Sequence, residues 1–202
     1  VRIDMDRADE LNDKCLTEEA NLINQLRVDA GTIVEPWSPD SLSKAFDNLG
    51  LWYPKTGRGN PSFTADWLNG HSHDFAKKIA EWRKVNKMRR DFVEGVCLNQ
   101  SYNGRIHAQF HALRKDADGT RSGRFSSSQP NLQQIPARDP HWGPLIRSLF
   151  LPDEGKQWAC LDYSQQEPRI LMHYAHLRKL KGAAAAVQMF NDDPETDFHQ
   201  MV

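Results

Sequence analysis

The sequence predicts an α+β chain, mostly helical over residues 1–100 and mixed over residues 101–202. Three observations support this class. Apolar residues recur at helical spacing over residues 5–28. Glycine and proline, which interrupt helices, do not occur before Gly31. Residues 105–111 alternate instead between apolar and polar side chains, a pattern typical of a strand.

Two further helices are expected in the first half of the chain. Ser38 as N-cap and Pro39 at the first helical position begin one of them, and Gly50 follows its end. After a loop rich in glycine and proline, Asp74 can cap a third helix that runs to about Cys97. Both helices carry apolar residues along one side, which we expect to be buried.

The second half mixes short elements with irregular chain. A polar stretch over residues 114–141 is longer than a connecting loop without a function usually is in a compact domain. Residues 158–162 read as a short apolar strand that ends in a carboxylate, with Cys160 buried in it. Helices are expected over residues 168–181 and residues 183–190.

The distribution of charge says more than its total. The chain has a formal net charge of -1, and no apolar run approaches the roughly eighteen residues of a membrane span, so we expect a soluble, intracellular protein. The net charge is -6 over residues 1–54, +7 over residues 55–124 and -2 over residues 125–202. A basic block between acidic flanks is typical of an anion-binding surface, although a solvated helix face with basic loops gives the same pattern.

The polar segment SGRFSSSQPNLQQIP, residues 122–136, is a first candidate site. It combines arginine, asparagine and glutamine with few apolar anchors. These are the side chains that reach base edges and backbone oxygens of nucleic acid. The alternative is an Ω-loop whose polar groups satisfy its own backbone.

A second candidate site follows the strand predicted over residues 158–162. Asp162 stands at its end, where a carboxylate can be both rigid and exposed, which suits a magnesium ligand. Glu167 follows at the N-terminal end of the next predicted helix. The alternative is that Asp162 caps this helix and that Glu167 complements its N-terminus.

Together these segments resemble the palm subdomain of the family A DNA polymerases. The family patterns are T-G-R-[LF]-S-S-x-x-P-N-L-Q-x-I-P and D-Y-S-Q-x-E-L-R, and this chain reads GRFSSSQPNLQQIP and DYSQQEPRI. Residues 49–64 and 81–95 are similar to the family's thumb loop and thumb helix, and residues 103–111 to its first palm strand. The resemblance implies an incomplete right-hand architecture, with a helical thumb over residues 1–100 and part of an antiparallel palm over residues 101–202.

The resemblance also implies catalytic roles. Asp162 would hold two Mg²⁺ ions, one of them with help from the backbone carbonyl of Tyr163. Glu167 would be the steric gate that occupies the space of a ribose 2′-hydroxyl. Arg138 and His199 would approach the triphosphate of the incoming dNTP, together with Glu167.

A further set of residues would contact the primer–template duplex. Arg124 would read the minor groove at the primer terminus, where the acceptors are nearly the same for every correct pair. Neighbouring duplex contacts and thumb contacts are implied for Asn131, Gln133, Gln134, Arg83 and Lys87. The thumb contacts would account for the basic block.

The implied function is template-directed DNA synthesis by two-metal catalysis in a bacterial or phage-infected cytoplasm. Its partners would be primer–template DNA, the remainder of the polymerase chain and a processivity factor, with no membrane role. The fingers pattern R…K…YG and the H-D-E pattern with the second metal-binding aspartate do not occur in these 202 residues. We therefore expect this chain alone to be inactive. The alternative is a non-catalytic duplex-binding module derived from a polymerase.

Overall fold

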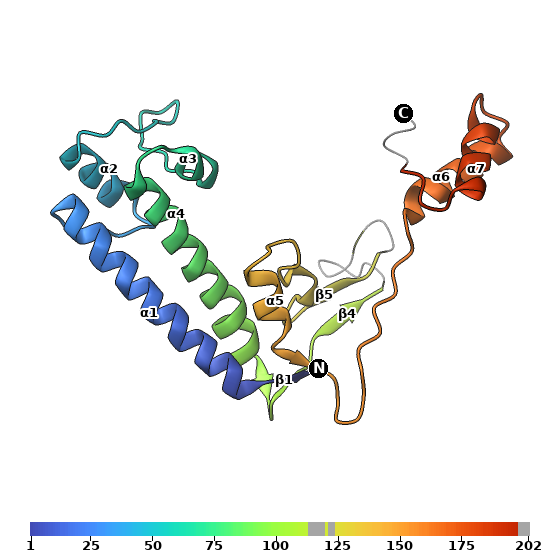
Figure 1. Cartoon of the computed structure of the whole chain (residues 1–202), viewed down its shortest axis with the longest axis horizontal. Coiled ribbons are helices and arrows are strands. Elements are labelled where there is room, and N and C mark those ends of the chain that lie inside the picture. The colour runs from blue at the N-terminus through green and yellow to red at the C-terminus, as the bar shows by residue number, and fades with distance from the viewer. Residues whose placement is uncertain (113–119, 121–123, 198–202) are drawn as a thin grey trace. The chain divides into compact units, whose positions relative to one another are not determined.

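Figure 1 shows the computed structural model of the chain, which describes residues 1–112, 120 and 124–197. The chain divides into two compact units, Val1–Lys156 and Gln157–Val202. Helices and antiparallel sheets occur together, which confirms the predicted α+β class. Within the first unit, the N-terminal strand pairs with strands that lie beyond residue 100. The division of the chain near residue 100 stays a prediction. The thumb and palm assignment stays a prediction.

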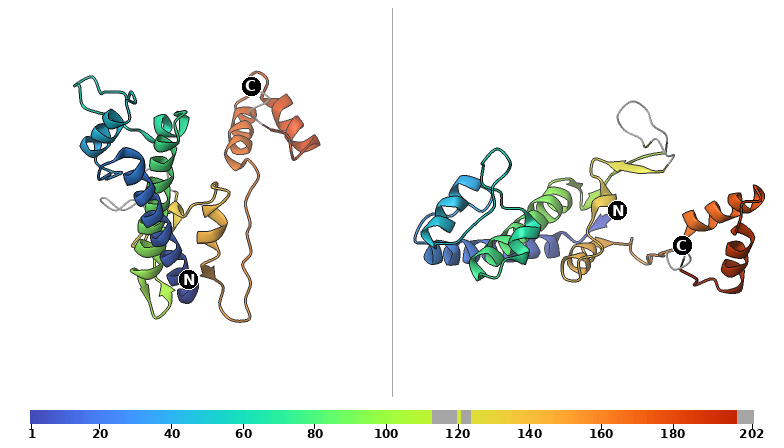
Figure 2. Two further views of the ribbon diagram at one scale, coloured as in Figure 1. Left: turned by 60° about the vertical axis from the view of Figure 1, so that its left-hand side comes forward. Right: turned by 90° about the horizontal axis from the view of Figure 1, so that it is seen from above.

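The long first helix, α1, spans Met5–Ala30 and confirms the helix predicted from residue 5 onward. The Asp4 carboxylate accepts a hydrogen bond from a backbone N–H of the first turn, and Gly31 ends the helix with a φ of 63°, which suits glycine. Helix α1 lies beside α4 (Asp74–Lys87) in every view (Figures 1 and 2). No helix of the described ranges is long and apolar enough to cross a membrane.

Two shorter helices lie at the end of the α1–α4 pair where α1 ends and α4 begins (Figure 1). Helix α2 spans Pro39–Asn48 with Ser38 as its N-cap, as predicted, and α3 spans Ala65–Gly70 with Thr64 as its N-cap. Phe46 is fully buried in the core that they share with α1 and α4. Its ring packs against those of Tyr53, Phe63, Trp67 and Phe75. This aromatic core fixes α2, α3 and the loop between them.

The helix predicted from Asp74 to about Cys97 is present, but one detail of the prediction is wrong. Asp74 is the first residue of the helix rather than its cap, because the His73 imidazole Nδ1 accepts the hydrogen bond from the Phe75 N–H at 3.2 Å. The helical segment ends at Leu98, close to the predicted end at about Cys97, but its winding changes on the way. It passes from α4 directly into a π-helix, η1 (Met88–Leu98). Apolar spacing alone does not distinguish the two windings over so short a length.

Four short strands form one antiparallel sheet in the order β2-β3-β1-β6. Their bounds are Ser101–Tyr102 for β2, Arg105–Ile106 for β3, Arg2–Ile3 for β1 and Phe150–Leu151 for β6. A second sheet pairs β4 (Gln109–His111) with β5 (Ser126–Ser128). The single strand predicted over residues 105–111 is therefore wrong, because β3 pairs with β1 and β2 whereas β4 pairs with β5.

The second unit contains α6 (Gln166–Leu177) and α7 (Ala183–Asp192), which pack against each other and confirm the two helices predicted there. The strand predicted over residues 158–162 is wrong. This segment is irregular, and Cys160 is exposed rather than buried. A strand is stable only when a neighbour satisfies its backbone groups, and no strand of the described residues pairs with this segment.

The three cysteines differ in accessibility. Cys15 and Cys97 are buried, and loss of hydration raises the pKa of their thiols to about 11 and about 12. Because the thiolate is the reactive species, we expect a thiol reagent at about pH 8 to label only Cys160 in the native chain and all three cysteines after denaturation. Peptide mass spectrometry measures this, and rapid native labelling of Cys97 would contradict the packing.

Candidate nucleic-acid interface

A groove of about 680 Å³ in the first unit lies between the end of α4, the π-helix η1 and the turn after β5. The residues that line it are Lys87, Asp91, Phe92, Val96, Gln100, Gln129, Pro130, Asn131 and Gln134. Three residues predicted to contact DNA thus come together, although they belong to segments far apart in the sequence. They are Lys87, Asn131 and Gln134.

The turn after β5 is held by its own hydrogen bonds. The buried Ser127 hydroxyl donates to the Pro130 carbonyl oxygen at 3.2 Å and accepts from the first N–H of the 3₁₀-helix η2 (Leu132–Gln134) at 3.3 Å. The Asn131 side-chain oxygen accepts from the Gln133 N–H at 3.1 Å and caps η2. These bonds support the Ω-loop alternative for the backbone, and they also hold the Asn131 side chain at the groove.

The other residues near this turn that are predicted to contact DNA differ in whether their side chains already make hydrogen bonds within the protein. The Gln133 amide nitrogen Nε2 donates to the Phe125 carbonyl oxygen at 2.9 Å, so part of this side chain serves the turn itself. Gln134 is exposed at the groove, and Arg124 is exposed just before β5. Of the two glutamines, Gln134 is therefore better placed to meet a ligand.

Arg83 contributes to the interior of the first unit. Its Nε donates to the Pro36 carbonyl oxygen at 2.7 Å, and its Nη1 donates to the Phe63 carbonyl oxygen at 2.6 Å. The guanidinium carbon lies 5.0 Å from the centroid of the Trp37 ring, and burial lowers the pKa of this side chain. Arg83 thus joins α4 to the loops on either side of α2. The phosphate contact predicted for it stays a prediction, with two of its three nitrogens already engaged.

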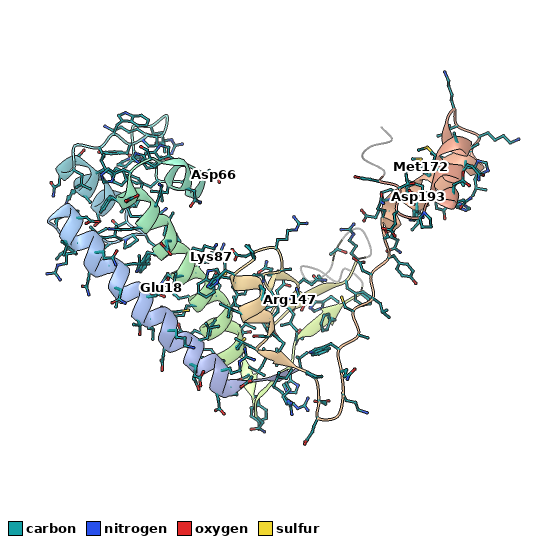
Figure 3. The ribbon with its side chains drawn as sticks, in the orientation of Figure 1. Glu18, Asp66, Lys87, Arg147, Met172 and Asp193 are labelled. Atoms are coloured by element: carbon teal, nitrogen blue, oxygen red, sulfur yellow. The ribbon has the colours of Figure 1, made fainter. Side chains whose placement is uncertain are left out.

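Lys87 lies at the end of α4, one turn beyond Lys84, and its side chain is exposed. Lys84 pairs with Asp139 at 2.7 Å, and Asp139 also accepts from the first N–H of α5 (Trp142–Arg147). These two bonds lower the pKa of the Asp139 carboxyl to about 2. The ion pair holds this face of α4 toward α5. Figure 3 shows Lys87 on the same side of α4.

The predicted catalytic residues lie in the second unit. Asp162, Tyr163 and Glu167 are all exposed, and Glu167 lies in the first turn of α6, as predicted. Asp162 follows an irregular segment rather than a strand. It is also not the cap of α6, because the N-cap position is Gln165, which makes no side-chain cap bond. The carboxylates of Asp162 and Glu167 both lie at the surface of the second unit.

Two residues that sequence reasoning missed hold the turn that precedes α6. Gln165 has a φ of 50°, and its Nε2 donates to the Thr196 carbonyl oxygen at 2.6 Å. Arg169 donates through Nε to the Ser164 carbonyl oxygen at 2.9 Å and through Nη2 to the Pro194 carbonyl oxygen. The pattern D-Y-S-Q-x-E-L-R carries a glutamine and an arginine at these positions, but a linear pattern does not show what they bond.

Oxygen donors of the kind that Mg²⁺ prefers are present at the Asp162 carboxylate and the Tyr163 carbonyl. Among the described residues, no three side chains of His, Cys, Asp or Glu come together as a metal site. The donor set therefore has the right chemistry but supplies only part of a coordination sphere. Of the residues predicted to approach a triphosphate, Arg138 is exposed in the first unit, and His199 lies outside the described residues.

The family model of DNA polymerase family A matches residues 5–202 of this sequence. The chain therefore belongs to DNA polymerase family A, which confirms the resemblance found in its sequence.

Relatives and a solved structure agree with this assignment. The chain is 39% identical over 219 residues to a DNA-directed DNA polymerase of Pseudomonas phage M6, covering 100% of this chain and 33% of that protein. It is 32% identical over 223 residues to DNA polymerase DpoZ of Salmonella phage PMBT28, covering 100% and 34%. The POL domain of Pol1 from M. smegmatis, solved with DNA primer-template and dNTP, matches 87% of this chain and 31% of its own, with a TM-score of 0.67 and 27% identity. The chain spans about a third of the length of the curated relatives it matches.

Proposed function

We propose that this chain supplies duplex binding and half of the active site of a polymerase that performs template-directed DNA synthesis. Residues 1–100 would form its thumb and residues 101–202 part of its palm. The observation that supports this most strongly is the groove at η1, which brings Lys87, Asn131 and Gln134 together in a family A chain. The structure of the solved relative is a complex with DNA primer-template and dNTP, which supports the same class of partner.

The groove suits the backbone and minor groove of a duplex. The Lys87 ammonium would pair with a phosphate, while the amides of Asn131 and Gln134 would donate to sugar or base-edge acceptors. Arg124 would contact the primer terminus in the same way. Because minor-groove acceptors vary little between correct pairs, these donors would test pairing geometry rather than sequence.

The second unit would contribute to the chemistry. The Asp162 carboxylate and the Tyr163 carbonyl would hold Mg²⁺, and Glu167 would exclude a ribose 2′-hydroxyl. When bound, two such ions lower the barrier to attack by a primer 3′-hydroxyl and stabilise the leaving pyrophosphate. Arg138 and His199 would approach the triphosphate, and the remainder of the polymerase chain would supply the missing ligands. A processivity factor is a further partner of this proposal, and the cytoplasm of a bacterial or phage-infected cell is its setting.

Duplex binding is tested by its dependence on salt. Each neutralised phosphate releases counterions, so we expect the affinity for a primer–template to fall steeply with salt. Lys87→Ala should lower the slope of log K against log[salt] by about one unit, because one phosphate contact is lost. Fluorescence anisotropy with a labelled duplex at several salt concentrations measures the slope.

Lys14→Ala is the matched control. Lys14 is an exposed lysine on α1, where it lies among Glu10, Asp13 and Glu18. It is not one of the residues that line the groove. Its loss removes the same charge and should leave the slope unchanged. A slope that responds equally to both substitutions, or to neither, would contradict a specific phosphate contact at Lys87.

A further inference from the structure

The helix that carries Lys87 changes its winding at the groove. Helix α4 is followed without a break by η1, a π-helix of 11 residues, Met88–Leu98. Its hydrogen bonds join residues five apart, and the last of them runs from the Asn99 N–H to the Glu94 carbonyl oxygen at 2.8 Å. Because π-helices occur mostly as single turns, often at functional sites, a stretch of this length calls for a physical cause.

The winding decides which side chains face the groove. At about 4.4 residues per turn, the positions four, five and nine residues after Lys87 all point within about 50° of it. These are Asp91, Phe92 and Val96, and all three line the groove. At about 3.6 residues per turn, the same helix would turn Val96 about 180° away and bring Glu94 to within about 20° of Lys87.

Gly95 is the first feature that holds the π winding. A Cβ at this position would collide with the Arg90 carbonyl oxygen, so a larger residue would force the helix to shift. The carbonyl oxygen of Gly95 itself accepts a hydrogen bond from the Gln100 side-chain nitrogen at 2.8 Å. Gln100 lines the groove, so this bond also connects the winding to the groove wall.

An ion cluster around Arg89 is the second feature. The Arg89 Nε lies 2.6 Å from Oε1 of Glu19 on α1, and its Nη1 pairs with Glu94. Glu19 is buried and also accepts from the Asn86 side-chain nitrogen at 3.0 Å. With only 12% of its side chain exposed, Arg89 holds the Glu94 carboxylate on the α1 side of the helix. Glu94 accordingly does not line the groove.

We propose that η1 is a positioning element for duplex binding, and that Gly95 and Arg89 are its positioning residues. This proposal rests on the proposed DNA contact at the groove. The π winding places Phe92 and Val96 beside Lys87 and keeps the Glu94 carboxylate on the opposite side of the helix. Asp91 already lies beside Lys87 in the groove. Loss of the π winding would add the Glu94 carboxylate next to Lys87, and this second negative charge would oppose the approach of phosphate.

Gly95→Ala tests the winding, with Gly70→Ala as the matched control, because a Cβ at Gly70 meets nothing within 4 Å. Alanine is the more stable residue in an ordinary helix interior. A lower Tm for Gly95→Ala alone would therefore report the π winding without any DNA. We also expect the Gly95→Ala chain to bind a short primer–template about three- to fivefold more weakly, the size of one exposed charge contact.

Glu94→Gln distinguishes a change of winding from general damage. Added to Gly95→Ala, it should restore most of the lost duplex affinity, because it removes the charge that has moved to the groove. Alone, it should change affinity by less than about twofold, since its side chain faces α1 and glutamine still accepts from Arg89. Equal effects of Glu94→Gln in both backgrounds, or unchanged binding by Gly95→Ala, would overturn the proposal.

If the Gly95→Ala chain does not fold, Arg89→Lys takes its place in the same cycle. Lysine keeps one charge but cannot span Glu19 and Glu94 together, so the same rescue by Glu94→Gln is expected. Absence of that rescue would overturn the positioning role.

Two outcomes separate this role from the proposed function. If the chain without substitutions binds no duplex at low salt, both the proposed function and the positioning role are overturned. Duplex binding that is indifferent to every one of these changes would overturn the positioning role alone.

Discussion

Replacing Asp162 by alanine is expected to abolish primer extension in a chain extended to the length of its phage relatives. The proposed ions supply several kcal/mol of transition-state stabilisation, and each 1.4 kcal/mol is tenfold in rate, so the loss should exceed about a thousandfold. Duplex affinity should change little, because a metal ligand serves the transition state more than the ground state. Single-turnover extension and anisotropy measure the two quantities on the same preparation.

Two further substitutions make this test specific. Asp162→Asn keeps the shape of the side chain and removes its charge, so it should fail nearly as completely as alanine. Glu195→Ala removes another exposed carboxylate of the second unit and should retain full activity. Extension by the Asp162→Ala chain at the normal rate would favour the alternative, a duplex-binding module whose chemistry lies elsewhere.

Sequence reasoning succeeded where structure is set locally. The bounds of α1 and α2 followed from apolar spacing, from the Ser38 cap and from glycine after the last turn, because each signal acts within a few residues. The strands were harder to predict. A strand such as β1 is two residues long, and its existence depends on partners about one hundred residues away. The segment over residues 158–162 has strand composition but no partner among the described strands.

The π-helix was beyond sequence reasoning for a different reason. Its residues satisfy a helical pattern at either winding, and the choice depends on Gly95 against the Arg90 carbonyl and on Arg89 between two carboxylates. Each of these is a tertiary or backbone contact that no propensity records.

The candidate site was predictable in part. The segments that line the groove were identified as nucleic-acid contacts from residue type and from the family pattern, and they do meet. The pattern could not distinguish Arg83, whose charge is used inside the fold, from Lys87, which is exposed four residues later. Basic residues on one helix look alike in sequence, and only packing decides which of them face solvent.

Glu167 occupies a position suited to a rigid steric role. It lies in the first turn of α6. The preceding turn is held by Gln165 and Arg169, which bond to the segment after α7, and by a further bond from Arg169 to the Ser164 carbonyl oxygen. A side chain on a fixed helical turn can exclude a group by its bulk, whereas one on a loose turn would move aside.

Glu167→Ala in the extended chain is therefore expected to raise the use of ribonucleotides relative to deoxyribonucleotides. Forcing one extra hydroxyl into a filled space costs about 1–3 kcal/mol, so its removal should change the ratio of kcat/KM values by about ten- to a hundredfold. Glu167→Gln keeps the bulk without the charge and should preserve discrimination, and Gln166→Ala, one residue earlier on the same turn, should leave it unchanged. If Glu167→Gln relaxed sugar selection as far as alanine does, charge rather than volume would be the discriminating property, and the steric role would be refuted.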